Sequence, residues 1–217
     1  MAKNKFLNDL KAAKVSIGII IFLIISFFVF AFFPAETMVA LLAIDTETVF
    51  SFSGFYQLFT YWIMQISLSN LLMISLSIIL AGAIIERVLS KKEMILLIAV
   101  SIILGGVLFA NLSKYAGLLL GASTLSWAYA GSAMIIVFRT WKKAPLSAKI
   151  IACFFSIGFF LLIFELFLLA NPAQKPLAIA NIACSLWGIG YSFQKMNDNL
   201  PWSEENESLA IPDTATE

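Results

Sequence analysis

Residues 116–138 read AGLLLGASTLSWAYAGSAMIIVF, an apolar run long enough to cross about 30 Å of hydrocarbon as a helix. The motif Gly121-Ala122-Ser123-Thr124 stands near its start. Positions 122, 126 and 130 carry small residues, and positions 123, 127 and 131 form a neighbouring stripe. Small residues spaced four apart let the backbone of another helix approach closely. This segment is therefore predicted to be a transmembrane helix packed inside a bundle.

The whole chain has the composition of an integral membrane protein. It has 217 residues, of which 61% are hydrophobic and 12% are charged, and its mean hydropathy is +0.95. This composition excludes an ordinary soluble domain. Apolar runs predict six transmembrane helices, at residues 15–33, 61–85, 94–112, 116–138, 148–170 and 177–193. We expect an all-α, polytopic membrane protein with a single domain.

The first apolar run has a second interpretation. The lysines before residue 15 and the sequence Val29-Phe30-Ala31 resemble a cleaved signal peptide, but the run is longer than such peptides usually have, which favours a retained anchor. Residues 1–14 are expected to form a basic cytoplasmic segment with a short interfacial helix. Residues 15–195 form the membrane domain, and residues 196–217 are expected to be an acidic, disordered tail.

The basic residues predict the orientation, because short loops rich in Lys and Arg stay in the cytoplasm. With both termini in the cytoplasm, 12 of the 14 basic residues fall on that side. Only Lys114 and Lys175 fall outside, and the connection of residues 34–55 lies outside as well. Short loops and the lack of an organelle-targeting pattern favour a bacterial cytoplasmic (inner) membrane.

Several kinds of site are not expected in this sequence. Cys153 and Cys184 fall inside predicted helices, where thiols behave as small apolar groups, so no disulfide is expected. Without histidine, and with only scattered acids, the chain predicts no metal site and no cofactor. The orientation rule already accounts for the basic residues, so nucleic acid is not an expected partner.

Polar residues inside membrane helices point to function, because each must find a partner away from lipid. Gln65 and Asn70 stand in the second predicted helix, and Asn181 stands in the sixth. We expect Asn181 and Ser123 to meet across a tight helix pair. A stripe of small residues is also common where helices merely pack, so the pattern alone does not establish a binding site.

The order of these motifs resembles the six-helix core of the rhomboid family. The resemblance rests on Phe55-Tyr56-Gln57-Leu58-Phe59-Thr60-Tyr61, on Gly82 with Glu86-Arg87, on Gly121-Ala122-Ser123, and on Gly188 in the last helix. It covers roughly residues 15–195. It implies that Ser123 corresponds to the catalytic serine of rhomboid proteases and Asn181 to their general base. It also implies that Gln65, Asn70 and Ile74 stand at the polar positions of the second helix, of which the last two help to stabilise the oxyanion.

The chain departs from an active rhomboid at these positions. It contains no histidine, and the amide of Asn181 is not basic enough to deprotonate Ser123. Ile74 cannot donate a hydrogen bond to an oxyanion. The resemblance therefore implies an inactive rhomboid, or pseudoprotease, and not an enzyme. Inactive members of the superfamily bind membrane clients, so the expected partners are membrane lipid and the transmembrane helices of other proteins.

This interpretation predicts no catalytic residue, and Ser123, Asn181 and Asn70 are vestigial positions of the catalytic site. It predicts two further sets of residues, for partner binding and for helix packing. The candidates for partner binding are Gln65, Asn70, Ser123, Ser126, Trp127, Asn181 and Glu165. The candidates for helix packing are Gly82, Gly121, Gly131, Cys184 and Gly188, with Gly188 expected against the helix face that holds Ala122, Ser126 and Ala130.

Other functions stay open at this point. An active serine protease would need a base other than histidine, and Lys114 is the one nearby lysine expected outside. A structural subunit of a membrane complex or transporter is a further possibility, although a transporter usually shows broken helices or a chain of intramembrane acids. Glu165 is either an acid at a helix end that reaches the headgroups or a contact for a partner helix.

Overall fold

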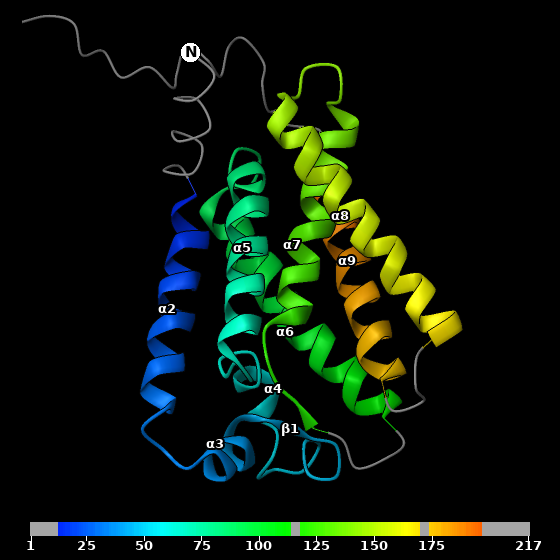
Figure 1. Ribbon diagram of the computed structural model, residues 1–217. Helices are drawn as coiled ribbons and strands as arrows, with labels where there is room; N and C mark the ends of the chain where they lie inside the picture. The colour runs from blue at the N-terminus through cyan, green and yellow to red at the C-terminus, as the bar shows by residue number, and fades with distance from the viewer. Residues whose placement is uncertain (1–12, 114–117, 170–173, 197–217) are drawn as a thin grey trace, which may run out of the picture.

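The computed structural model describes residues 13–113, 118–169 and 174–196. Its elements are α2 (Lys14–Phe30), α3 (Ala35–Leu42), β1 (Ile44–Asp45), α4 (Gln57–Thr60), α5 (Leu68–Ile85), α6 (Lys91–Leu112), β2 (Leu118–Leu119), α7 (Ser123–Arg139), α8 (Leu146–Phe164), the π-helix η1 (Glu165–Leu169) and α9 (Lys175–Lys195). The long helices form a bundle, and α3, α4 and the two strands gather at one end of it, here called the β end (Figure 1). Residues 1–12 of the expected N-terminal segment 1–14, and residues 197–217 of the expected acidic tail 196–217, lie outside the described residues.

Four helices of the described chain are long and apolar enough to cross a membrane, namely α5, α6, α8 with most of η1, and α9. Both α2 and α7 have 17 residues. These helices correspond in order to the six predicted spans. The protein is therefore an integral membrane protein, as its composition predicted.

The second predicted span began too early. The structure starts α5 at Leu68 and not at residue 61, because Ser67 has an extended backbone and its hydroxyl accepts the N–H of Asn70 at 3.2 Å. Such a serine satisfies one of the N–H groups that the first turn of a helix leaves free. Gln65 therefore lies in the turn before the helix rather than on its face.

The fourth predicted span also began too early, for a different reason. Leu118 and Leu119 form β2, which pairs in antiparallel fashion with β1 through Ile44 and Asp45. Gly121 then adopts a φ of +96°, a conformation that glycine reaches without steric cost. The chain turns at Gly121, and α7 begins two residues later.

α4 and the turn that follows it pack against the two strands of the β end. The Oε1 of Gln57 accepts the backbone N–H of Asp45 at 3.1 Å, which ties α4 to β1. Tyr61, Leu58 and Ile44 belong to the same buried cluster as Leu119. This packing fixes the turn that carries Gln65 beside the strand that leads into α7.

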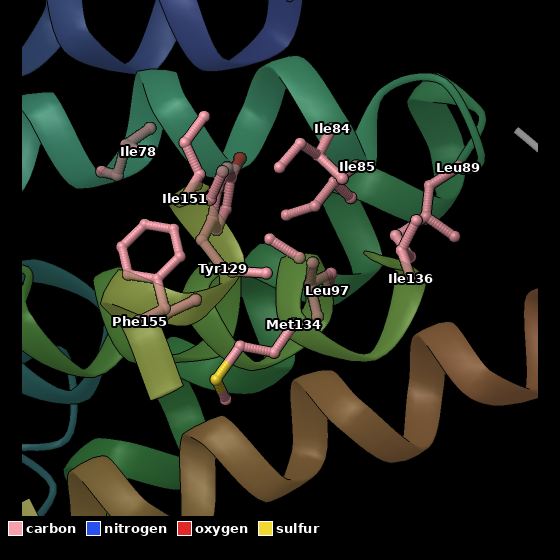
Figure 2. Packing of buried hydrophobic residues seen from close by; sticks show 14 of the residues in the cluster. Ile78, Ile84, Ile85, Leu89, Leu97, Tyr129, Met134, Ile136, Ile151 and Phe155 are labelled. Carbon is pink, nitrogen blue, oxygen red and sulfur yellow. The ribbon is translucent and has the colours of Figure 1, made fainter. Parts of the chain in front are cut away.

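The main core surrounds α7, whose residues are mostly buried. Figure 2 shows Tyr129, Met134 and Ile136 of α7 among side chains of α5, α6 and α8, such as Ile78, Leu97 and Phe155. α8 lies at one edge of the bundle. Only 17% of an 18-residue apolar stretch of this helix is buried, compared with 50% of the corresponding stretch of α9. A helix with so much apolar surface outside the core is suited to a lipid environment.

Glu86 joins the first helix of the bundle to α5. Its carboxylate accepts the backbone N–H groups of Val15 and Ser16 at 3.0 and 2.7 Å, and the hydroxyl of Ser16 at 2.6 Å. A carboxylate at this place satisfies free N–H groups of α2 and interacts favourably with the positive end of that helix. Gly82 permits the contact, since a Cβ at this position would overlap the side chain of Ser16.

The basic residues of the described chain gather at the end opposite the β end. They occur at the start of α2 and α6, at the end of α7 and α9, and in the connections 86–90 and 140–145 with the first turn of α8. Lys175, at the start of α9, is the single described basic residue at the β end. Lys114 lies outside the described residues.

Candidate functional site

The start of α7 is held in place by Tyr61. The backbone N–H of Gly121 donates to the carbonyl oxygen of Tyr61 at 3.0 Å. The buried hydroxyl of Tyr61 donates to the carbonyl oxygen of Ile102 at 2.9 Å and shares a 2.8 Å hydrogen bond with the hydroxyl of Thr124. One tyrosine therefore connects the turn before α7, the first turn of α7 and the middle of α6.

Ser123 is the first residue of α7 and is half-buried. Ala122 precedes it at the N-cap position, where no side chain accepts a hydrogen bond from the first turn. The first N–H groups of an α-helix have no partner within the helix. This end of α7 therefore presents hydrogen-bond donors and a partial positive charge beside Ser123.

Gln65 and Asn70 lie beside the turn at Gly121. A Cβ at Gly121 would lie 3.4 Å from Oε1 of Gln65 and 3.6 Å from Nδ2 of Asn70. Gln65 is 4% exposed, its Nε2 donates to the carbonyl oxygen of Trp62 at 2.9 Å, and its Oε1 is buried without a hydrogen-bond partner. The structure thus brings together two of the predicted polar residues, two positions before Ser123.

Asn181 lies on α9, which packs along α7. The two helices run in the same direction, because Ser132 contacts Gly188 and Arg139 bonds to the carbonyl oxygen of Phe193 nearer the far end. Continuing this register toward the β end places Asn181 level with residues 125–127 of α7, within about one turn of Ser123. Asn181 is 6% exposed and its Oδ1 has no hydrogen-bond partner. In the described chain no hydrogen bond joins Asn181 to Ser123, and their meeting across the helix pair stays a prediction.

The predicted packing of α9 on α7 is confirmed, but the expected face of α7 was wrong. A Cβ at Gly188 would overlap the carbonyl oxygen of Ala128 and lie 2.8 Å from Oγ of Ser132. A Cβ at Gly131 would overlap the backbone of Ser185. Ala122 and Ala130 instead belong to the core cluster. The contact face carries residues 128 and 132 because the backbone of α9 crosses α7 there.

The remaining packing candidates act at other interfaces. The thiol of Cys184 approaches the carbonyl oxygen of Ser101 on α6 at 3.4 Å. Gly82 contacts α2 through Ser16, and Gly121 serves the turn described above rather than a helix contact. Gly105, which the sequence analysis did not single out, lies against Thr124 and lets α6 approach the first turn of α7.

Three candidates for partner binding are separate from the turn at Gly121. Ser126 and Trp127 are half-buried on α7, and the indole of Trp127 faces Phe159 of α8 with ring centroids 6.5 Å apart. Glu165 is exposed at the start of η1, next to the exposed side chain of Phe164. Trp127 and Glu165 therefore lie on the α8 side of the bundle.

The comparison with known families decides the identity. Residues 53–197, more than half of the 217-residue chain, match a family model described as the Rhomboid domain. The chain belongs to the rhomboid family. The rhomboid match extends from the turn before α4 through α9 and so contains Gln65, Asn70, Ser123 and Asn181. No curated protein matches the chain.

The candidate site combines the serine hydroxyl of Ser123 with the amides of Gln65, Asn70 and Asn181. The 217-residue sequence has no histidine, and Ile74 is a buried residue of the main core. In the described part of the chain, no group of three or more His, Cys, Asp or Glu residues is placed to hold a metal ion. Ser123, Gln65, Asn70 and Asn181 can therefore donate and accept hydrogen bonds, but none of these four side chains is a strong base.

Tyr61 and Thr124 were not predicted as members of the site. Tyr61 was placed at the start of a transmembrane helix, where a tyrosine commonly marks the interface. Its hydrogen bond to Thr124 joins residues 63 positions apart. The one available signal was that Thr124 directly follows the Gly121-Ala122-Ser123 motif, where a polar residue must find a partner.

Proposed function

We propose that this rhomboid-family protein is catalytically inactive and binds the transmembrane helices of partner proteins. The observation that carries the proposal is the absence of histidine from a chain with a serine in the rhomboid frame. A serine hydroxyl is a poor nucleophile until a base removes its proton, and Asn181 cannot do so. Removal of a triad base typically lowers the rate by several orders of magnitude.

The polar atoms that the site retains support binding. Oε1 of Gln65 and Oδ1 of Asn181 are buried acceptors without partners, and Oε1 of Gln65 lies at Gly121, just before the uncapped start of α7. Polar groups at membrane depth are stabilised when a partner helix supplies hydrogen bonds that lipid does not. A helix that enters this region gains such contacts without being cut.

The proposal includes a topology. The six helices α2, α5, α6, α7, α8 and α9 cross the membrane, with the β end outside and both termini in the cytoplasm. The gathering of Lys and Arg at the opposite end supports this orientation. We place the protein in a bacterial cytoplasmic membrane. Membrane lipid contacts the exposed apolar face of α8.

A paired experiment tests the proposal. The full chain is purified in mild detergent as the wild type and as Ser123→Ala, and each is treated with a fluorophosphonate probe and analysed for co-purifying membrane proteins. The proposal expects no labelling of Ser123 and the same transmembrane partners with both variants. Labelling that disappears in Ser123→Ala shows a functional nucleophile, and the absence of any transmembrane partner contradicts helix binding.

A further inference from the structure

Gln65 presents its amide oxygen, and not its nitrogen, to the turn before Ser123. Only the NH₂ group of the amide donates hydrogen bonds, and this group is engaged by the carbonyl oxygen of Trp62 at 2.9 Å. The opposite atom, Oε1, is buried without a partner and lies beside Gly121. This position therefore offers an acceptor, and the amide nitrogen of Asn70 adds a donor 3.6 Å from the same Cβ position.

Asn181 offers a second buried acceptor on the other side of α7. Its side chain is 6% exposed and its Oδ1 has no partner. Its neighbour Ala180 belongs to the buried cluster that contains Tyr61 and Leu119, and the register of the two helices sets Asn181 level with the first turns of α7. The start of α7 thus has an unpartnered carbonyl oxygen from α9 in addition to the one from Gln65.

Oε1 of Gln65, Oδ1 of Asn181 and the start of α7 determine which groups a ligand must carry. A buried acceptor without a hydrogen bond is unfavourable, so each oxygen favours a ligand N–H. The free N–H groups in the first turn of α7 favour a carbonyl oxygen. A carboxamide carries both groups on one planar unit and has no net charge.

We propose that the region formed by Gln65, Asn181 and the start of α7 binds the carboxamide side chain of an Asn or Gln in a partner transmembrane helix. This inference rests on the proposed function and specifies the ligand chemistry of the same site. The amide N–H donates to Oε1 of Gln65 or Oδ1 of Asn181, and the amide oxygen accepts from the first turn of α7. A carboxylate is disfavoured by the two carbonyl oxygens, and an ammonium is disfavoured by the positive helix end.

The experiment uses the full chain in lipid nanodiscs and a labelled polyleucine host helix. One guest position, at the depth of the α7 start, carries Asn, Asp or Leu. Affinity is measured by energy transfer at constant lipid. The Asn helix is expected to bind about three- to fifteenfold more tightly than the Leu helix, the range of interhelical hydrogen bonds in membranes, and the Asp helix no more tightly than the Leu helix.

Two variants of the protein locate the effect. Gln65→Met keeps the side-chain length and removes the acceptor, and Asn181→Leu removes the second acceptor. Each is expected to reduce the preference for the Asn helix toward the value for Leu. Asn111→Leu is the control, since Asn111 is exposed and bonds only within α6, to Val107. It is expected to keep the full preference.

The outcomes separate this inference from the proposed function. Saturable binding of the Asn, Asp and Leu helices with equal affinity overturns the carboxamide site and leaves helix binding intact. Tighter binding of the Asp helix than of the Asn helix shows an anion site and also overturns the inference. An Asn preference that persists in both Gln65→Met and Asn181→Leu places the contact elsewhere. No binding of any helix overturns both proposals.

Discussion

The hydroxyl of Ser132 on α7 donates a 3.1 Å hydrogen bond to the carbonyl oxygen of Gly188 on α9. This bond is possible only because Gly188 has no side chain, since a Cβ there would overlap the carbonyl oxygen of Ala128. A similar approach occurs where Gly131 of α7 meets Ser185 of α9. Two glycines and two serines thus allow α7, which carries Ser123, to pack closely against α9, which carries Asn181.

Replacement of Gly188 is expected to destabilise the bundle. Gly188→Ala adds a methyl group where the Ala128 carbonyl lies, and overpacking of this kind typically costs about 1–3 kcal/mol. Gly190→Ala is the matched control, because nothing lies within 4 Å of its Cβ position. The control is expected to be neutral or stabilising, since alanine is a better helix former than glycine. Thermal unfolding in one detergent compares them, and equal melting temperatures contradict the tight pair.

Removal of the Glu86 carboxylate is expected to loosen α2. Glu86→Ala leaves the N–H groups of Val15 and Ser16 without their acceptor, and loss of a helix cap typically costs about 0.5–2 kcal/mol. The readout is proteolysis or hydrogen exchange at the start of α2. Glu47→Ala, at an exposed position of the β end, is the control and is expected to behave as the wild type. Equal protection of α2 in both variants contradicts the capping role.

Tyr61→Phe tests the connection beneath the site. The change removes the hydroxyl that bonds to Ile102 and Thr124, and leaves the buried carbonyl of Ile102 without that donor. The expected loss of stability is about 1–3 kcal/mol. Tyr56→Phe removes an equivalent hydroxyl from an exposed ring and should have little effect. If both variants unfold at the wild-type temperature, the Tyr61 hydroxyl does not support the start of α7.

The sequence identified the helices and the family, but not all of the boundaries. Hydropathy measures how apolar a segment is and not how its backbone is bonded, so residues 61–67 were read as helix although α5 begins only at Leu68, after its N-cap Ser67. Likewise, β2 and the turn at Gly121 stand within an apolar run. The bond between Glu86 and Ser16 joins residues 70 positions apart and has no local signal.

The sequence predicted the serine and amide members of the candidate site, but neither Tyr61 and Thr124 nor the geometry. Ser123, Gln65 and Asn70 were predicted as candidates for partner binding, and the structure places Gln65 and Asn70 at Gly121, two positions before Ser123. Which end of an amide faces the site depends on its neighbours, here the carbonyl oxygen of Trp62. The same limit applies to Gly188, whose spacing predicted a contact with α7 but not the contact with Ala128 and Ser132.

The proposed orientation is tested by reporter fusions. Alkaline phosphatase, which is active only outside the cytoplasm, is expected to be active when inserted in the connection that contains Ser51 and Ser53. The same reporter is expected to be inactive after Lys195 and between Lys142 and Lys143, in accordance with the distribution of basic residues. An active reporter after Lys195 contradicts a six-span topology with both termini in the cytoplasm.

The most direct test of the account measures cleavage and binding in one liposome assay. A labelled transmembrane helix with a central Asn is incubated with the wild-type protein, with Ser123→Ala, and with an active rhomboid protease as the positive control. The account predicts that wild type and Ser123→Ala bind the helix with the same affinity and that neither cleaves it. Cleavage by the wild type that is lost in Ser123→Ala would show that this rhomboid is an active protease.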